Sequence, residues 1–168
     1  PCTPGVMACR LAGSDRFGTS AKLSAMVFPD GAETVFIATG RNYPDALAGA
    51  TVAAQFHAPI LLVDTNTVPS VVATELTRLD PSTIVILGGT TAVSTGVETT
   101  LAGYGAVIRV FGDNRYATAA AISEYGFPAG SDTVFIATGT GFVDALTGCP
   151  VAAVFDAPLL LVPPGGIP

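Results

Sequence analysis

The chain contains the same segment twice, and this internal repeat limits its possible folds more than any other feature. Residues 10–63 align with residues 109–162 without a gap, at a constant offset of 99 positions, and 29 of the 54 aligned residues are identical. The block Thr-Val-Phe-Ile-Ala-Thr-Gly occurs at 34–40 and again at 133–139. A period of this length is the size of a domain, whereas solenoid repeats are about 20–50 residues long. The sequence therefore predicts two copies of one folding unit.

The second copy is shorter than the first. Its match ends at Val162, and no later residues correspond to residues 65–108 of the first copy. We therefore divide the chain into a complete repeat at 10–108, an incomplete repeat at 109–168 and an N-terminal extension at 1–9. Either the second repeat has been cut short, or the half-unit completes a sheet with the first copy. The repeat pattern leaves both explanations open.

Apolar runs of strand length alternate with segments of helical periodicity. The runs are continuously apolar, which is typical of parallel strands that are covered on both faces. Helices between such strands form right-handed crossovers. We predict an α/β fold of three layers, helix–sheet–helix, with mostly parallel strands. The predicted strands are 34–39, 60–63, 83–87, 107–110, 133–138 and 159–162, and the predicted helices are 19–28, 44–56, 70–79, 94–102, 118–125 and 143–155.

Composition excludes several classes of protein. With 49% hydrophobic and 12% charged residues, the chain can bury enough apolar surface to fold, so intrinsic disorder is excluded. No apolar run reaches the roughly 18–20 residues of a membrane-spanning helix. The net charge of −6 argues against general nucleic-acid binding, which needs a basic surface. The chain begins with Pro1, so we expect a mature or trimmed form.

Residues for metal binding or catalysis do not occur in the required patterns. Three cysteines, Cys2, Cys9 and Cys149, and the one histidine, His57, lack zinc-site spacing. Cys2 and Cys9 either close a short disulfide loop or stay reduced. The sequence has no Asp-x-Asp pair, no Gly-x-Ser-x-Gly elbow and no Lys-Ser/Thr ending of a phosphate-binding loop. We predict no metal, no cofactor and no catalytic residue, and place His57 on the surface.

Four motifs follow one another in a fixed order. Each copy opens with Arg-x-x-Gly-x-x-Arg-aromatic-x-Thr, at 10–19 and 109–118. Ile-Ala-Thr-Gly-Arg-Asn-Tyr-Pro-Asp-Ala-Leu follows at 37–47, then Ala-Pro-Ile-Leu-Leu at 58–62 and Val-Ile-Leu-Gly-Gly-Thr-Thr-Ala-Val-Ser at 85–94. This order resembles the type 2 cell-wall-binding repeat family of Gram-positive bacterial surface proteins.

The resemblance implies a fold, a function and a location. It implies Toprim-like α/β repeat units, which assemble with other repeats of the same type as a trimer or pseudo-trimer. It also implies a secreted protein of the cell surface, held non-covalently to an anionic cell-wall polysaccharide. The family's stretch for polymer attachment corresponds to Pro59, Ile60, Leu61 and Leu62, and to Pro158 and Leu159 in the second copy. Apolar strand residues of this kind are usually core, so the polymer contact rests on the resemblance.

Arginines recur at matched places in an otherwise acidic chain. Arg10 and Arg16 are repeated as Arg109 and Arg115, and together they are four of the seven basic residues. Each planar guanidinium is suited to a phosphate or carboxylate of the polymer. The alternative is an internal ion pair, Arg16 with Asp45 and Arg115 with Asp144.

Two glycine-containing loops follow predicted strands, where ligands of parallel sheets bind. The first contains Arg41 and Asn42, which we take as polymer-binding candidates, and the second contains Gly88 and Gly89. The alternative in both cases is a tight turn that needs glycine. Asp45, at a helix start, fits a helix cap better than a general base.

These observations predict a non-catalytic module that anchors a surface protein to the wall. The alternative is a structural spacer or oligomerisation module with no affinity for carbohydrate.

Overall fold

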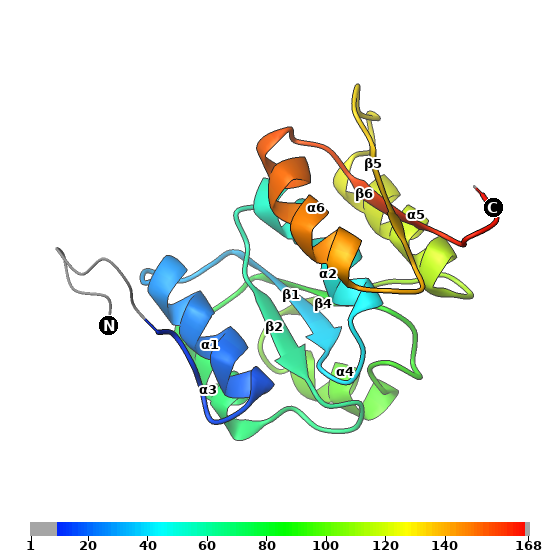
Figure 1. Ribbon diagram of the computed structural model, residues 1–168. Coiled ribbons are helices and arrows are strands. Elements are labelled where there is room, and N and C mark those ends of the chain that lie inside the picture. The colour runs from blue at the N-terminus through cyan, green and yellow to red at the C-terminus, as the bar shows by residue number, and fades with distance from the viewer. Residues whose placement is uncertain (1–9, 167–168) are drawn as a thin grey trace, which may run out of the picture.

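The computed structural model describes residues 10–166, in which helices and strands alternate along the chain (Figure 1). The helices are α1 (Arg16–Val27), α2 (Pro44–Gln55), α3 (Ser70–Leu79), α4 (Thr95–Leu101), α5 (Arg115–Gly126) and α6 (Val143–Val154). The strands are β1 (Thr34–Thr39), β2 (Ile60–Val63), β3 (Thr83–Leu87), β4 (Ala106–Val110), β5 (Phe135–Thr138) and β6 (Leu159–Val162). All predicted elements are therefore confirmed, with shifts of a few residues at their ends.

The largest shifts occur at the starts of α1 and α5, which begin three residues earlier than predicted. Asp15 accepts a hydrogen bond from Gly18 N at 2.8 Å, and Asn114 accepts one from Ala117 N at 3.0 Å. A side-chain oxygen before the first helical residue satisfies an otherwise unbonded N–H group and so fixes the start of the helix. The apolar pattern alone does not contain this signal.

The strands form two separate parallel sheets. One has the order β2-β1-β3-β4, and the other consists of β5 and β6. Phe36 pairs with Ile60 in the first sheet, and the equivalent Phe135 pairs with Leu159 in the second. Strands β5 and β6 of the second copy therefore repeat the pairing of β1 and β2 but do not extend the first sheet.

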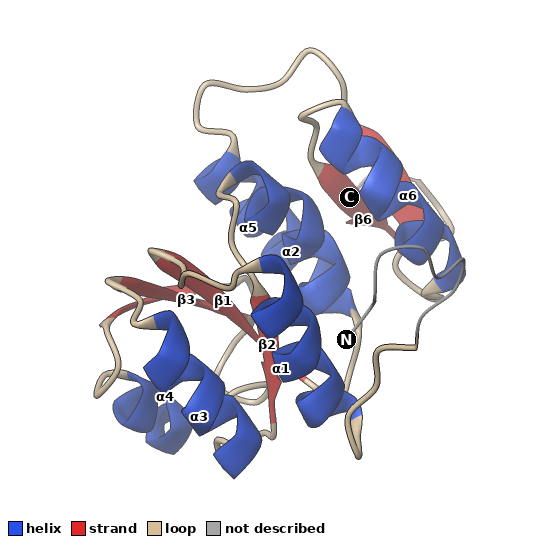
Figure 2. Ribbon diagram, turned by 90° about the vertical axis from the view of Figure 1, so that its left-hand side faces the viewer, coloured by secondary structure: helices blue, strands red, loops and turns tan. Residues whose placement is uncertain are grey.

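Helices cover both faces of the four-stranded sheet, which confirms the predicted layers (Figure 2). On one face Ile37 and Ile86 pack with Leu76 of α3 and Leu101 of α4. On the other face the apolar cluster includes Phe36, Val52 of α2 and Ile122 of α5, and continues to Leu159 and Leu161 of β6. The two copies thus share one core, in which a fully buried side chain of this size contributes about 1.5–3 kcal/mol.

Helix α2 of the first copy packs on α5, α6 and β6 of the second. Gly126 of α5 lies so close to α2 that a Cβ atom there would be 2.5 Å from Val52 Cγ2. The Cys149 thiol of α6 donates to the Leu47 carbonyl at 3.2 Å. At the N-terminal ends of α2 and α6, the rings of the equivalent residues Tyr43 and Phe142 are 5.6 Å apart. These contacts fix the position of one copy relative to the other.

Within residues 10–166, no helix combines the length and the apolar character that crossing a membrane requires.

Candidate functional site

The recurring Arg-aromatic pair holds the loop after the first strand of each copy. Arg16 Nη1 donates to the Gly40 carbonyl, and Arg115 Nη1 donates to the Gly139 carbonyl at 2.6 Å. A Cβ atom on Gly40 would lie 2.5 Å from Phe17 Cε1, so glycine is required for this close approach. The predicted alternative, an ion pair of Arg16 with Asp45 and of Arg115 with Asp144, is therefore wrong. Within the described residues, neither arginine forms an ion pair with either aspartate.

Arg109 lies inside the molecule. Its guanidinium pairs with Glu98 at 2.9 Å and donates to the Gly88 carbonyl at 2.8 Å, and its side chain is only 9% exposed. It is internally ion-paired, as the alternative for these arginines supposes, and it fixes the loop after β3. The equivalent Arg10 is exposed.

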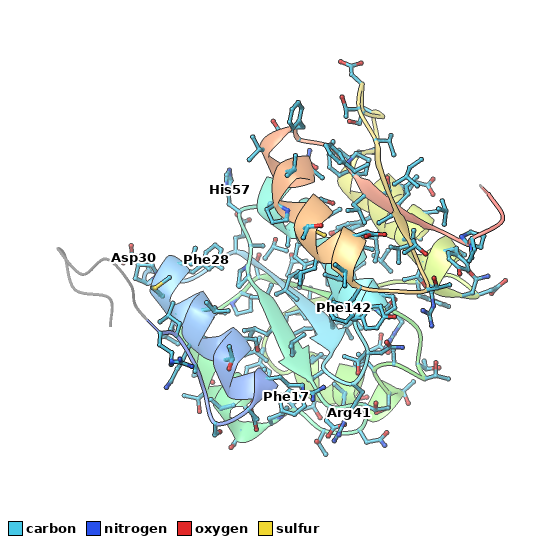
Figure 3. All side chains as sticks on the ribbon, viewed as in Figure 1. Phe17, Phe28, Asp30, Arg41, His57 and Phe142 are labelled. Carbon is cyan, nitrogen blue, oxygen red and sulfur yellow. The ribbon has the colours of Figure 1, made fainter. Side chains whose placement is uncertain are left out.

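A cavity of about 310 Å³ lies between the copies, at the carboxyl ends of β1, β3 and β4. We call it the inter-repeat pocket. The first copy contributes Thr39, Arg41, Asn42, Asp45, Gly89 and Thr91 to its wall. The second copy contributes Asp113, Asn114, Arg115 and Thr118. Arg41 lies at this edge of the molecule, whereas His57, exposed as predicted, lies at the opposite end of α2 (Figure 3).

Asp45 is a partly buried acidic group at the pocket wall. It is the second residue of α2, and its carboxylate packs against Gly88 and accepts no hydrogen bond from the described residues. Burial raises the pKa of Asp45, and the charge of Arg115 opposes this rise without cancelling it. The prediction of a helix cap is wrong, because Tyr43 is the N-cap and α2 has no side-chain cap.

Both asparagines of the pocket use their carbonyl oxygen internally. Asn114 Oδ1 accepts from Tyr116 N at 2.9 Å and from Ala117 N, while Asn42 Oδ1 accepts from Tyr43 N at 3.0 Å. The Nδ2 groups, which are donors, are therefore left for other partners. These amides offer donors to whatever enters the pocket.

Arg41 is neutralised at the rim of the pocket. Its Nε donates to Asp64 Oδ1 at 2.9 Å, and its Nη2 donates to Asp64 Oδ2. This contact raises the pKa of Arg41 and, through the same hydrogen bond, lowers that of Asp64. The arginine thus enters the pocket wall as one half of an ion pair.

The two Pro-x-Leu-Leu stretches lie mostly in the interior. Pro59 and Pro158 are buried, and Leu61 and Leu159 are 0% and 2% exposed. Ile60 and Leu62 are half-buried and line a second, apolar cavity of about 380 Å³, which also contacts α1 and the start of α2. We call it the α1–α2 groove.

Among the described residues, the one cysteine, Cys149, adds no reactive group to the site. Cys149 is buried, and this burial raises the pKa of its thiol to about 11. Cys2 and Cys9, the possible disulfide pair, lie outside the described residues. Within the described range, no three His, Cys, Asp or Glu side chains group as metal ligands.

Sequence reasoning did not single out Asp113, Asn114 and Thr118 as residues of the site. Their signal is the position of the second Arg-x-x-Gly motif directly after β4, because loops at strand ends form ligand sites in parallel sheets. Recognising it requires knowing that β4 belongs to the sheet of the first copy.

The comparisons with known proteins agree with this architecture. Residues 10–98 and 109–167 match the family described as "cell wall binding domain 2". The chain is 34% identical over 152 residues to the N-acetylmuramoyl-L-alanine amidase LytC of Bacillus subtilis, and 32% identical over 160 residues to the amidase enhancer of the same organism. The match covers 90% of this chain and 30% of LytC. For the amidase enhancer, it covers 95% of this chain and 22% of the enhancer.

Two solved structures from Clostridium difficile are also similar. Cwp6 matches 94% of the chain with a TM-score of 0.89 and 28% identity, and Cwp8 matches 91% with a TM-score of 0.82 and 32% identity. The chain spans 25% and 27% of those proteins, so it corresponds to a part of each.

Proposed function

Because the chain belongs to the cell wall binding domain 2 family, we propose that it is a non-catalytic module that holds its protein at the cell wall by binding an anionic wall polysaccharide. The observation that carries this proposal is the inter-repeat pocket, which both copies build at the carboxyl ends of parallel strands. Such an edge is the usual ligand site of α/β sheets.

The relatives support binding rather than catalysis as the shared property. An amidase and an amidase enhancer both contain the matched region, and the chain covers less than a third of each. A segment shared by an amidase and an amidase enhancer is best explained by a common role in attachment. We therefore place the protein at the cell wall or cell surface.

Some candidate residues would touch the polymer directly, whereas others hold the binding surface in place. Arg41, Asn42 and Arg115 line the pocket and would touch the polymer there, while Arg10 and Arg16 are exposed and would meet its anionic groups. The internal candidates support the site from within: Arg109 holds the Gly88 carbonyl, and Pro59, Ile60, Leu61, Leu62, Pro158 and Leu159 position β2 and β6.

Co-sedimentation with purified Bacillus subtilis cell walls tests the proposal. Thr91 is exposed on the pocket wall, so Thr91→Trp fills the pocket without disturbing the core. We expect this variant to bind walls at least about tenfold more weakly. Thr99→Trp, at an exposed position of α4 outside the pocket wall, is the matched control and should bind normally. Equal binding by the two variants would exclude the pocket as the polymer site.

A second function, self-association, is favoured by the α1–α2 groove. In the second copy the equivalent surface, over β6, is covered by α2, and Ile122 and Leu159 are 1% and 2% exposed there. In the first copy the equivalent Leu23 is 44% exposed. Leu146 of α6 is 54% exposed and corresponds to Leu47 of α2. We propose that α6 of a second copy of this chain lies in the α1–α2 groove, as one contact of a trimer.

Analytical ultracentrifugation tests this association. We expect oligomers at high protein concentration, and their loss in Leu23→Glu and in Leu146→Glu, since each variant places a charge in the apolar contact. A monomer at every concentration would contradict self-association and would not affect the proposed wall binding.

A further inference from the structure

We propose that the inter-repeat pocket recognises the hydroxyl groups of an uncharged sugar unit in the wall polymer, and not the phosphate or carboxylate groups of that polymer. This inference rests on the proposed wall-binding function and names the chemistry that the pocket selects. It is carried by the charge balance of the pocket, by the engagement of its arginines and by the donors and acceptors that remain.

The charges of the pocket wall balance. Arg41 and Arg115 supply two positive charges, and Asp45 and Asp113 supply two negative ones. Asp64, which is paired with Arg41, adds a third carboxylate next to the pocket. An anionic group entering here would meet Asp45 and Asp113 at close range, and like charges repel strongly where water is partly excluded.

The arginines are already engaged by the protein. Arg41 makes two hydrogen bonds to Asp64, and Arg115 donates to the Gly139 carbonyl. A fork-shaped contact from Arg41 to phosphate would require breaking its ion pair. An anion would therefore gain little from Arg41, and at Arg115 it would compete with Asp45, whose carboxylate this arginine already stabilises.

The groups that remain match hydroxyl groups. The Asp45 carboxylate lacks a hydrogen-bond partner among the described residues and needs a donor. The Nδ2 groups of Asn42 and Asn114 need acceptors. A sugar hydroxyl donates one hydrogen bond and accepts others, so neighbouring hydroxyls satisfy both kinds of group, whereas a phosphate dianion only accepts.

The size of the pocket fits one sugar ring. Its volume of about 310 Å³ is close to the lower end of the range of about 300–1,000 Å³ that small-molecule sites occupy. A single unit of the chain would fill it, while the rest of the polymer would continue over the exposed surface.

The repeat provides a matched internal control. Asp144 occupies the position of Asp45 in the second copy, yet it is exposed and lines none of the described pockets around the strand ends. The same substitution at the two positions therefore separates an effect of the pocket from a general effect of lost charge.

The experiment measures binding of soluble polysaccharide released from Bacillus subtilis walls, by isothermal titration calorimetry. We expect Asp45→Ala to weaken binding by about tenfold or more, and Asp144→Ala to leave it unchanged. Unfolding curves of both variants establish that they are folded. Equal effects of the two substitutions would overturn the proposal.

Competition then identifies the recognised group. Oligosaccharides of the same polymer, freed of phosphate by hydrofluoric acid and N-acetylated to remove amine charge, should compete fully, and inorganic phosphate should not. Binding of these neutral oligosaccharides should change less than about twofold between roughly 50 and 500 mM NaCl, because they lack the anionic groups that Arg10 and Arg16 would meet. If inorganic phosphate competed and the oligosaccharides did not, the proposed recognition of sugar hydroxyls would be wrong. The proposed wall binding would not be affected by that result. Failure of the unmodified protein to bind the intact polymer would instead contradict the proposed function itself.

Discussion

Asp45 and Gly88 meet across the strand ends so closely that a Cβ atom on Gly88 would lie 2.3 Å from Asp45 Oδ2. Gly88 also has a φ of 100°, a backbone conformation that side chains with a Cβ atom rarely adopt. Glycine is therefore needed at this position for two reasons, the left-handed backbone and the space that the carboxylate occupies.

We predict that Gly88→Ala lowers the free energy of unfolding by about 1–3 kcal/mol, because it adds backbone strain and displaces Asp45. Urea unfolding followed by circular dichroism measures the change. Gly89→Ala is the control, since a Cβ atom there would meet only Phe111 Cδ2, at 3.6 Å. Equal stability of the two variants would contradict the contact between Asp45 and Gly88.

The raised pKa of Asp45 predicts a pH dependence of stability. Between the ordinary pKa of an aspartate and the raised one, the folded protein binds more protons than the unfolded chain, so stability falls as pH rises through this window. Asp45→Asn removes the desolvated charge. We expect this variant to be more stable than the unmodified protein at neutral pH. Its stability should no longer fall as pH rises through this window.

Denaturant unfolding at a series of pH values tests this prediction. Asp144→Asn serves as the control, because Asp144 is exposed, and its curve should run parallel to that of the unmodified protein. A stability of Asp45→Asn at neutral pH equal to or below the unmodified value would show that Asp45 is not held in a desolvated position.

Most of the fold follows from the sequence because its signals are local. In β1, Ile37 faces one apolar cluster and Phe36 the other, so the strand has no polar face, and an uninterrupted apolar run indicates this directly. The internal repeat then transfers each assignment from one copy to the other. Boundaries set by side-chain caps, such as Asn114, required the structure.

The site was less predictable because it depends on how the copies pack. Asp113 and Asp45 line one pocket only because α2 lies on α5 and β4 joins the first sheet. The partner of Arg16 is a backbone carbonyl, and every residue has one, so no sequence pattern identifies it. Arg109 illustrates the same limit, since Glu98 reaches it from α4.

Cys149 should be chemically inert in the folded protein. Its thiol has a pKa of about 11, so roughly one molecule in a thousand carries the reactive thiolate at pH 8. In a Cys2→Ser/Cys9→Ser variant, we expect reaction with a disulfide reagent to be at least about 100-fold slower than in urea. Comparable rates in the two conditions would mean that α6 does not bury this residue against Leu47.

Two equivalent valines, Val52 and Val151, lie in different surroundings. Val52 of α2 is fully buried against Gly126, whereas Val151, at the same position of α6, is 46% exposed. Removing two buried methyl groups costs their transfer free energy and leaves a cavity, so Val52→Ala should destabilise the protein by roughly 2 kcal/mol. Val151→Ala should change stability by less than about 0.5 kcal/mol. Urea unfolding at low protein concentration compares the two variants. Equal losses would contradict the packing of α2 between the copies, on which the inter-repeat pocket depends.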